Sequence, residues 1–288
     1  MKQILVTGSN GQLGSEIRLL SKQYSQFNFI FTDRDELDIT NIEKLNQFFL
    51  KQKVDYIINC AAYTAVDKAE QEKELSDLLN HKAVENLLSA SQKYKTKLFQ
   101  ISTDYVFGGV HNIPLTEELP TNPESAYGLS KLKGEAVAEK SQRAIIIRTS
   151  WLYSSYGANF VKTIRKYARE RDQLSVVFDQ IGTPTYARDL AKNILNIIQI
   201  SEESNEFKNG IYHFANEGVI SWYDFAKEIC DISNIEVNIV PVLSDQFPTP
   251  AQRPAYSVLN KKKIKNTFNI EIPYWRDSLR ICIKLLQE

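Results

Sequence analysis

Short apolar runs alternate with longer stretches of helical periodicity through the first two thirds of the chain. The apolar runs have the length of buried strands: Gln3 to Thr7, Phe27 to Thr32, Val54 to Asn59, Lys97 to Ser102 and Ala144 to Thr149. The stretches between them place apolar residues at helical spacing. Strands that alternate with helices predict an α/β fold, with a mostly parallel sheet and helices on both of its faces.

A glycine-rich turn joins the first predicted strand to the first predicted helix. Three glycines are spaced GxxGxxG between residues 8 and 14. Glycines permit a tight turn and close approach of a ligand, and the helix N-terminus offers free N–H groups to a pyrophosphate. This predicts a dinucleotide site; the alternative is a glycine-rich turn that holds no ligand. The predicted contacts in this segment are Gly8, Asn10, Gly11, Gln12, Leu13 and Gly14.

The last third of the chain departs from the regular alternation, with more loops and aromatic residues, as a cover for a bulky substrate would have. An apolar helix begins at residue 189, and a strand lies within 208–216. We therefore predict a Rossmann-type doubly wound parallel sheet with a smaller, discontinuous C-terminal substrate domain. The dinucleotide-binding domain takes residues 1–150 and about 189–216; the substrate-binding domain takes about 151–188 and 217–288.

The end of the second predicted strand carries conflicting signals about the cofactor. Asp33 can accept hydrogen bonds from a ribose 2′-OH and would repel a 2′-phosphate, whereas Arg34 could do the opposite. The choice between NADH and NADPH therefore stays open. Asp38 or Thr40 could cap the following helix, or Asp38 and Ile39 could line the adenine pocket.

The third predicted strand is followed by small residues. Ala61 and Ala62, with Tyr63 after them, would let a cofactor approach the backbone at the strand's carboxyl end. The stretch from Leu75 to Ser91 is predicted as a helix. Asn80 lies inside it, either exposed or as a polar bracket near the site.

Tyr127 and Lys131 are four residues apart in a helical pattern, so they share one face of a helix. A neighbouring ammonium favours phenolate, which would lower the phenol's pKa and help it to exchange a proton near neutral pH. Thr103, at the end of the fourth predicted strand, could hydrogen-bond both a carbonyl oxygen and the phenol. The alternative for Tyr127 and Lys131 is that both are ordinary surface residues on a helix. The alternative for Thr103 is that its hydroxyl forms an ST-turn that closes the strand.

Three later residues can be interpreted in more than one way. Trp151 follows a strand, where an aromatic ring is either core or a platform for a sugar or base. Arg253 in a proline-rich loop could meet a phosphate. His213, flanked by aromatic residues, is predicted to be structural.

The composition excludes several classes of protein. Hydrophobic residues make up 43% and charged residues 24% of the 288, and 35 basic residues balance 35 acidic ones. A chain without a basic excess is not expected to bind nucleic acid. No apolar run approaches the roughly 20 residues of a membrane helix, and the start is too short for a signal peptide. Three distant cysteines without metal spacing indicate a reduced, cytoplasmic protein.

Several stretches together resemble one family. The glycine spacing, Thr103 and Tyr127-x-x-x-Lys131 resemble the extended short-chain dehydrogenases/reductases. More specific stretches resemble the dTDP-4-dehydrorhamnose reductase family within that group: residues 7–14, 59–70, 102–107, 148–153, 159–163 and 179–185, and Arg253-Pro254 with Ser257 and Leu259. The resemblance covers essentially the whole chain.

The resemblance implies that NADPH or NADH reduces the C4 keto group of dTDP-4-dehydro-L-rhamnose, the last step of dTDP-L-rhamnose synthesis for cell-surface polysaccharide. It implies that Tyr127 gives a proton to the alkoxide, Lys131 tunes Tyr127 and holds the nicotinamide ribose, and Thr103 bonds the carbonyl oxygen. The substrate contacts that it implies are Thr64, Val66, Thr103, Asp104, Tyr105, Trp151 and Arg253. It also allows a homodimer with Mg²⁺ at the interface, although no residue here is predicted as a metal ligand.

The chain departs from the family pattern at two places. Cys60 stands where Ala is expected, and Asp33-Arg34 matches neither a clear NADH nor a clear NADPH pattern. A non-catalytic regulatory subunit of the methionine adenosyltransferase type, or another nucleotide-sugar reductase or epimerase, are the alternative functions. The presence of Thr103, Tyr127 and Lys131 together favours an enzyme.

Overall fold

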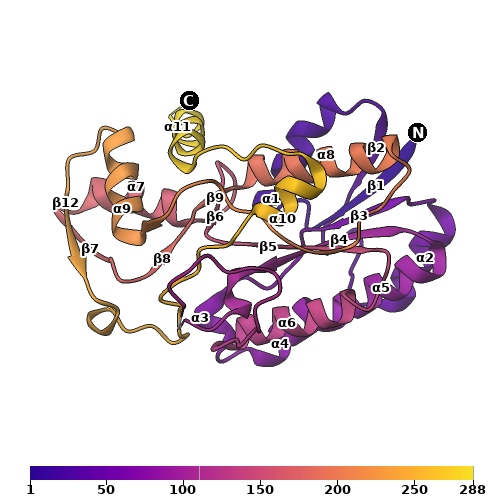
Figure 1. The fold of residues 1–288 in the computed structure, drawn as a ribbon, viewed down its shortest axis with the longest axis horizontal. Coiled ribbons are helices and arrows are strands. Elements are labelled where there is room, and N and C mark those ends of the chain that lie inside the picture. Colours follow the sequence, from indigo (N-terminus) through magenta and orange to yellow (C-terminus); the bar gives the residue numbers. More distant parts are fainter. Residues whose placement is uncertain (110, 288) are drawn as a thin grey trace.

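The computed structural model describes residues 1–109 and 111–287; residues 110 and 288, the first of them in the predicted loop 108–125, lie outside the description. A parallel sheet with helices on both faces confirms the predicted fold class (Figure 1). Within the described residues the sheet has six strands in the order β10-β5-β4-β3-β1-β2. Their bounds are β1 (Lys2–Thr7), β2 (Phe27–Phe31), β3 (Tyr56–Asn59), β4 (Lys97–Thr103), β5 (Ala144–Thr149) and β10 (Gly210–His213).

Helices cover the sheet because alternate residues of each strand point to opposite faces. Ile4 and Val6 of β1 lie in the same apolar layer as helices α1 and α8, and Leu5 lies in the layer of α2 and α5. In Figure 1, α8 lies above the sheet and α5 and α6 lie below it. Their bounds are α1 (Gln12–Leu20), α2 (Ile42–Lys51), α5 (Ala83–Tyr94), α6 (Ala126–Ala138) and α8 (Ala187–Glu203).

A second region, at the left of Figure 1, has its own apolar core. Strand β7 pairs with β12 in parallel, and helices α7, α9 and α11 contribute apolar side chains to this core. The bounds of these elements are α7 (Phe160–Glu170), β7 (Gln173–Val177), α9 (Trp222–Ile232), β12 (Asn238–Val242) and α11 (Trp275–Leu285). A capping box between Ser221 and Asp224 starts α9.

Short elements connect the two regions. Strand β6 pairs with β9, and β8 pairs with β11. The bounds of the remaining strands and helices are α3 (Val66–Ala69), α4 (Lys73–Asp77), β6 (Leu152–Tyr153), β8 (Ile181–Gly182), β9 (Thr185–Tyr186), β11 (Ile220–Ser221) and α10 (Lys262–Phe268). In the part of the chain that the structure covers, no helix is long and apolar enough to cross a bilayer.

The structure corrects two details of the sequence analysis. The predicted helix 75–91 is interrupted by a π-helical turn at Leu78–Lys82, between α4 and α5. Neither Asp38 nor Thr40 caps α2, because the Asp38 carboxylate binds the Thr40 hydroxyl at 2.6 Å. Instead, the Asn41 side chain accepts the first N–H groups of that helix.

The π-helical turn packs directly against α6. A Cβ atom at Gly134 would overlap the carbonyl oxygen of Asn80. Helix α6 can therefore pack this closely against the π-helical turn only with a glycine at position 134. This close contact fixes the position of the whole helix.

Gly134→Ala is therefore expected to destabilise the protein, although alanine is the better helix former. Propensity alone would stabilise the helix by about 1 kcal/mol, whereas forcing a methyl group into a packed contact costs about 1–3 kcal/mol. Denaturant unfolding measures the net sign. The control is Ala136→Gly on the exposed side of the same helix, for which propensity predicts a loss of about 1 kcal/mol. A more stable Gly134→Ala protein would contradict the close contact.

Candidate active site

The glycine turn closes tightly between β1 and α1. Gly8 has a φ of +61°, and a side chain there would come within 2.6 Å of the Ala61 backbone. Gly14 is equally confined, since its Cβ would lie 2.5 Å from the Cα of Ser9. Gly11 caps α1 without a side-chain hydrogen bond, so the first N–H groups of the helix are available to an anion.

A first cavity of about 340 Å³ lies beside this turn. It contains eight predicted cofactor contacts: Gly8, Gly11, Asp33, Arg34, Asp38, Ile39, Ala61 and Ala62. Leu75 and Leu78 of the α4–α5 segment line the same cavity while more than 40% exposed. An apolar wall with a carboxylate at its rim suits a planar base and its ribose.

Asp33 holds the glycine turn in place through its carboxylate. One oxygen accepts a hydrogen bond from the Asn10 N–H at 3.1 Å, and the other accepts from the Arg34 N–H at 2.9 Å. The Arg34 side chain is exposed. At Asp38, the hydrogen bond from Thr40 lowers the pKa of the carboxyl group. Asp33 and Asp38 both line the first cavity, as predicted, and Arg34 lines it as well.

Asn80 fixes the segment that follows β3. Its side-chain oxygen accepts the Tyr63 N–H at 2.9 Å, and its side-chain nitrogen donates to the Tyr63 carbonyl at 3.0 Å and to Ser130 Oγ at 3.0 Å. Asn80 is only 1% exposed, which decides between the two alternatives for this residue in favour of a polar bracket. The Tyr63 side chain instead turns to Glu72, and Tyr63 lines neither cavity.

A second cavity of about 540 Å³ shares the glycine turn, Cys60 and Ala62 with the first. The three predicted catalytic residues line it together. So do Gln12 and Leu13, although the Leu13 side chain is also part of the core. The predicted substrate contacts in this cavity are Thr64, Val66, Thr103, Asp104, Tyr105 and Trp151.

Tyr127 and Lys131 reach this cavity from α6, which begins where Ser125 accepts the Gly128 N–H at 3.1 Å. Burial raises the pKa of Tyr127 to about 12, and the Thr103 hydroxyl opposes this rise. The predicted lowering of the Tyr127 pKa is therefore not found. Burial also lowers the pKa of Lys131 to about 8, and its ammonium donates to the Ile101 carbonyl at 2.6 Å. Burial is the largest cause of both shifts.

Thr103 links the end of β4 to an acidic group. Its hydroxyl accepts the Tyr105 N–H at 3.2 Å, which is the predicted turn, and donates to one Asp104 oxygen at 3.0 Å. The other Asp104 oxygen is buried and has no hydrogen-bond partner among the described residues. Burial raises the pKa of the Asp104 carboxyl to about 6, opposed by the nearby hydroxyls of Ser257 and Thr103, of which only Thr103 has hydrogen-bond geometry towards it. A polar ligand atom in the cavity would find an acceptor there.

Trp151 forms one wall of the second cavity. It takes a left-handed φ of 47°, which is rare outside glycine, and its ring stacks on Trp222 with 3.6 Å between centroids. The indole is thus both packed and part of the cavity. Its stacking on Trp222 fits the core interpretation, and its role as a platform for a sugar or base stays a prediction.

Arg253 lies outside the linings of both cavities. Its guanidinium binds the carboxylate of Asp67 through two nitrogens, at 2.8 and 3.1 Å. The Ala251 N–H donates to the same carboxylate at 3.2 Å. These contacts hold the loop around Arg253 against α3, whose first residue, Val66, lines the second cavity.

The whole chain, residues 1–288, matches the family model described as the RmlD substrate binding domain. The chain belongs to this family. The match spans the full sequence, so it includes the glycine turn, α6 and the second region around α7, α9 and α11.

Curated relatives and solved structures of the RmlD family agree. A protein of Burkholderia thailandensis named dTDP-4-dehydrorhamnose reductase is 37% identical, with 98% of each chain covered. One of the same name from Aggregatibacter actinomycetemcomitans is 38% identical, over 97% of this chain and 98% of that one. A crystal structure of a dTDP-4-dehydrorhamnose reductase from Clostridium acetobutylicum has a TM-score of 0.94 at 42% identity, covering 99% of this chain and all of that one.

A relative from Bacillus anthracis was solved in complex with NADP. It is 37% identical, with a TM-score of 0.91 over 99% of this chain and all of that chain. The same fold therefore binds a dinucleotide in this relative.

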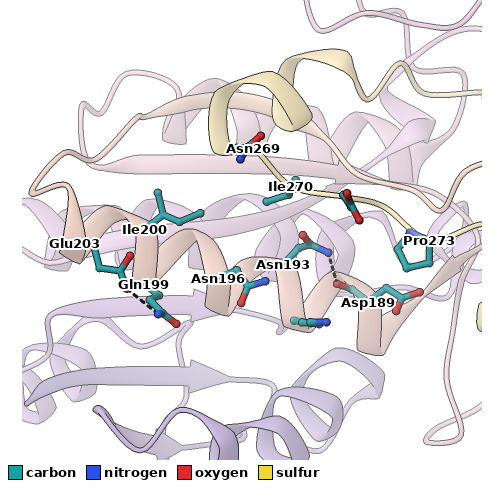
Figure 2. Close-up of a pocket in the computed structure, with 11 residues that line it drawn as sticks. Asp189, Asn193, Asn196, Gln199, Ile200, Glu203, Asn269, Ile270 and Pro273 are labelled. Carbon is teal, nitrogen blue, oxygen red and sulfur yellow. Dashed lines mark hydrogen bonds between the residues drawn. The ribbon is translucent and has the colours of Figure 1, made fainter.

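The hollow between α8 and residues 269–273 measures about 360 Å³ (Figure 2). It contains none of the predicted site residues. Its polar groups bond within the protein: Asn193 donates to the Asp189 carbonyl, and Gln199 donates to Glu203 at 2.8 Å, as the dashed lines show. Across residues 1–109 and 111–287, no group of three or more His, Cys, Asp or Glu residues is arranged to hold a metal.

The sequence analysis assigned no role to Glu135 and Arg148, which form a buried ion pair behind Lys131. A signal was present in the sequence. Arg148 is a charge inside an apolar strand run, and Glu135 follows Lys131 by one helical turn. Charged residues at such positions are rarely buried unless they are paired.

Two glycine substitutions should separate dinucleotide binding from folding. Gly11 is exposed and a Cβ there meets only the Gly8 carbonyl, at 3.3 Å, so Gly11→Ala should fold normally. Because Gly11 lines both cavities, the methyl group should weaken NADPH binding about tenfold or more. Gly14→Ala should lower the melting temperature, because its Cβ has no room. Titration calorimetry and thermal unfolding measure the two effects; unchanged affinity in Gly11→Ala would remove the pyrophosphate from this turn.

Proposed function

We propose that this protein reduces the C4 keto group of dTDP-4-dehydro-L-rhamnose to the alcohol of dTDP-L-rhamnose. The observation that carries the proposal is the second cavity, where Thr103, Tyr127 and Lys131 line one space that continues into the glycine turn. Membership of the RmlD family, and the names of its relatives, support this substrate.

The residues around the two cavities fit a nicotinamide dinucleotide. The first cavity has apolar walls and acidic groups for an adenosine, and the uncapped start of α1 suits a pyrophosphate. NADPH or NADH, when bound, would supply the hydride that C4 receives. Lys131, on the wall of the second cavity, would donate hydrogen bonds to the ribose of the nicotinamide.

The chain's own residues handle the proton. As C4 receives the hydride, the carbonyl oxygen becomes an alkoxide, and the Tyr127 hydroxyl gives it a proton. The Thr103 hydroxyl, which donates to Asp104 in this structure, would turn its proton to stabilise negative charge on that oxygen or on the phenolate that remains. A Tyr127 pKa of about 12 suits this direction, because the phenol keeps its proton until an alkoxide, a stronger base, forms beside it.

Substrate recognition is assigned to the remaining residues of the second cavity. Asp104 has an oxygen free to accept a sugar hydroxyl, and Trp151 offers a flat apolar surface. We assign the thymidine diphosphate to the side where Thr64, Val66 and Arg253 lie. Arg253 would reach it only by giving up part of its contact with Asp67.

The predicted division into domains is kept as part of the proposal. Residues 1–150 and about 189–216 would bind the dinucleotide, and about 151–188 and 217–288 the nucleotide sugar. The apolar core of the second region supports this division, although Ile264, Phe268, Ile270 and Ile272 pack into the core of the first region. A cytoplasmic location, with the thiols of Cys60, Cys230 and Cys282 reduced, also belongs to the proposal. A homodimer with Mg²⁺ at its interface remains a prediction, which light scattering with and without chelator tests.

Tyr127→Phe is expected to lower turnover about a hundredfold or more, the scale of a positioned general acid, while NADPH binding stays nearly unchanged. The variant removes one hydroxyl and keeps the ring. The measurement is single-turnover reduction of dTDP-4-dehydro-L-rhamnose, followed by loss of NADPH absorbance. The control is Tyr153→Phe, which removes a buried hydroxyl from the core of the second region, away from the reaction.

The same assay separates the alternatives. Net NADPH consumption with the keto-sugar supports a reductase, conversion without net consumption supports an epimerase, and no reaction with any keto-sugar supports a regulatory subunit. Wild-type turnover in Tyr127→Phe would end the assignment of the proton donor.

Asp33→Ala should shift preference from NADH towards NADPH, because it removes an acceptor for the 2′-OH and a charge that repels a 2′-phosphate. Arg34→Ala should shift preference the other way. Asp33 also binds the Asn10 N–H, so both cofactors will bind somewhat less well in Asp33→Ala. The ratio of the two kcat/KM values is therefore the measurement. A ratio that moves in neither variant would place the ribose elsewhere.

A further inference from the structure

A buried ion pair lies behind the second cavity. Glu135 on α6 and Arg148 on β5 are 2% and 3% exposed. Arg148 donates to the Glu135 carboxylate through Nε at 3.0 and 3.1 Å and through Nη2 at 2.7 Å. The pair ties the helix that carries Tyr127 to β5, which lies next to the edge strand β10.

His213 completes the cluster as a neutral side chain. Burial lowers its pKa to about 3, and the Arg148 charge adds to this. Its Nδ1 donates to the Leu115 carbonyl at 3.1 Å, so its Nε2 is left to accept from Arg148 Nη1 at 3.4 Å. The guanidinium also lies over the Phe107 ring, 5.0 Å from its centroid. Arg148 is thus held on three sides, and its charge is balanced by Glu135 alone.

Lys131 is one helical turn before Glu135 and is 4% exposed. Its recorded hydrogen-bond acceptor, the Ile101 carbonyl, is uncharged. A buried ammonium with a neutral acceptor tends to lose its proton, because burial penalises the charged form. Glu135 opposes this loss, since it is the charged group that raises the Lys131 pKa.

The other titratable groups around Lys131 do not provide that charge. Tyr127 on the same helix and Cys60 after β3 are neutral at pH 7, since burial raises the pKa of each. Arg148 on β5 binds Glu135, and His213 on β10 contacts Arg148 and the Leu115 carbonyl. After β4, Asp104 lines the same cavity, with its carboxyl bonded by Thr103 and its pKa raised to about 6, and Tyr105 there is neutral. At the start of α6, Glu70 binds the Ala126 N–H.

We propose that Glu135 is a positioning residue for the reduction: its carboxylate, held in place by Arg148, keeps the Lys131 ammonium charged within the buried wall of the active site. The effect of Glu135 on catalysis rests on the proposed function, whereas its effect on the charge of Lys131 does not. The charge state of Lys131 can be measured without cofactor or substrate. The Glu135 carboxylate lies one helical turn from the buried Lys131, on the same helix.

The test is a direct titration of Lys131 in the full-length protein. Lysine labelled with ¹³C at Cε gives an NMR signal whose shift follows the amine proton, and Lys131→Met identifies the signal. In Glu135→Gln the pKa of Lys131 should fall by about one unit or more, a tenfold loss of proton affinity, because a neighbouring buried charge shifts a pKa on this scale. NADPH affinity should then begin to fall at a correspondingly lower pH than in the wild type.

The matched control is Glu16→Gln. Glu16 is also fully buried and also pairs with an arginine, Arg188 at 2.8 Å, but it lies on α1 and does not line the second cavity. It should lower stability without moving the Lys131 titration. Glu135→Gln/Arg148→Gln replaces both charges by neutral hydrogen-bonding groups, which keeps the test available if Glu135→Gln alone does not fold. The Lys131 pKa in this double variant should lie below that of the wild type.

An unchanged Lys131 titration in Glu135→Gln or in the double variant would overturn the inference, and so would an equal shift in Glu16→Gln. A lowered Lys131 pKa in a protein that fails to reduce the keto-sugar would instead retain the inference and reject the proposed function.

Discussion

The close approach of α6 to the loops at the carboxyl edge of the sheet is the constraint on which the active site depends. Two glycines mark it: side chains at Gly128 and Gly134 would overlap the carbonyl oxygens of Tyr105 and Asn80. With the helix at this depth, Tyr127 and Lys131 become buried yet still line a cavity. A helix displaced outward by one methyl group would leave both side chains more hydrated and farther from Thr103.

Burial at this depth then decides the electrostatics. A phenol and an ammonium in water would both keep ordinary pKa values, and their attraction would matter most. Here burial moves both pKa values towards the neutral forms, to about 12 for Tyr127 and about 8 for Lys131. The phenol is thereby kept as a proton donor. The lysine needs a compensating carboxylate, and Glu135 is the one that α6 itself provides.

The two cavities are joined by the topology of the sheet. Strand order reverses next to β1, so the ends of β1 and β3 flank a crevice where a ligand can lie across the glycine turn. Gly11, Cys60 and Ala62 line both cavities for this reason. Small side chains at the junction keep it open, and Cys60 is the largest of the three. An elongated dinucleotide can therefore lie with one end in each cavity.

Local sequence patterns predict the main strands and helices and much of the candidate chemistry. Buried strands appear as apolar runs and a glycine turn as spaced glycines, because these signals are local in the chain. The helical period alone put Tyr127 and Lys131 on one face. The strands of the sheet and the grouping of Thr103 with Tyr127 followed from such local patterns.

Properties that depend on what surrounds a side chain become visible only once the chain is folded. The sign of the Tyr127 pKa shift follows from burial, and the Asp67 partner of Arg253 lies 186 residues away in the chain. The Asn80 side-chain amide forms two hydrogen bonds with the backbone of Tyr63, and no spacing in the sequence reveals this contact. Glu135 and Arg148 likewise acquire their importance from a buried contact between a helix and a strand. Charge, burial and partner are properties of the packed interior, and a linear pattern of residues does not contain them.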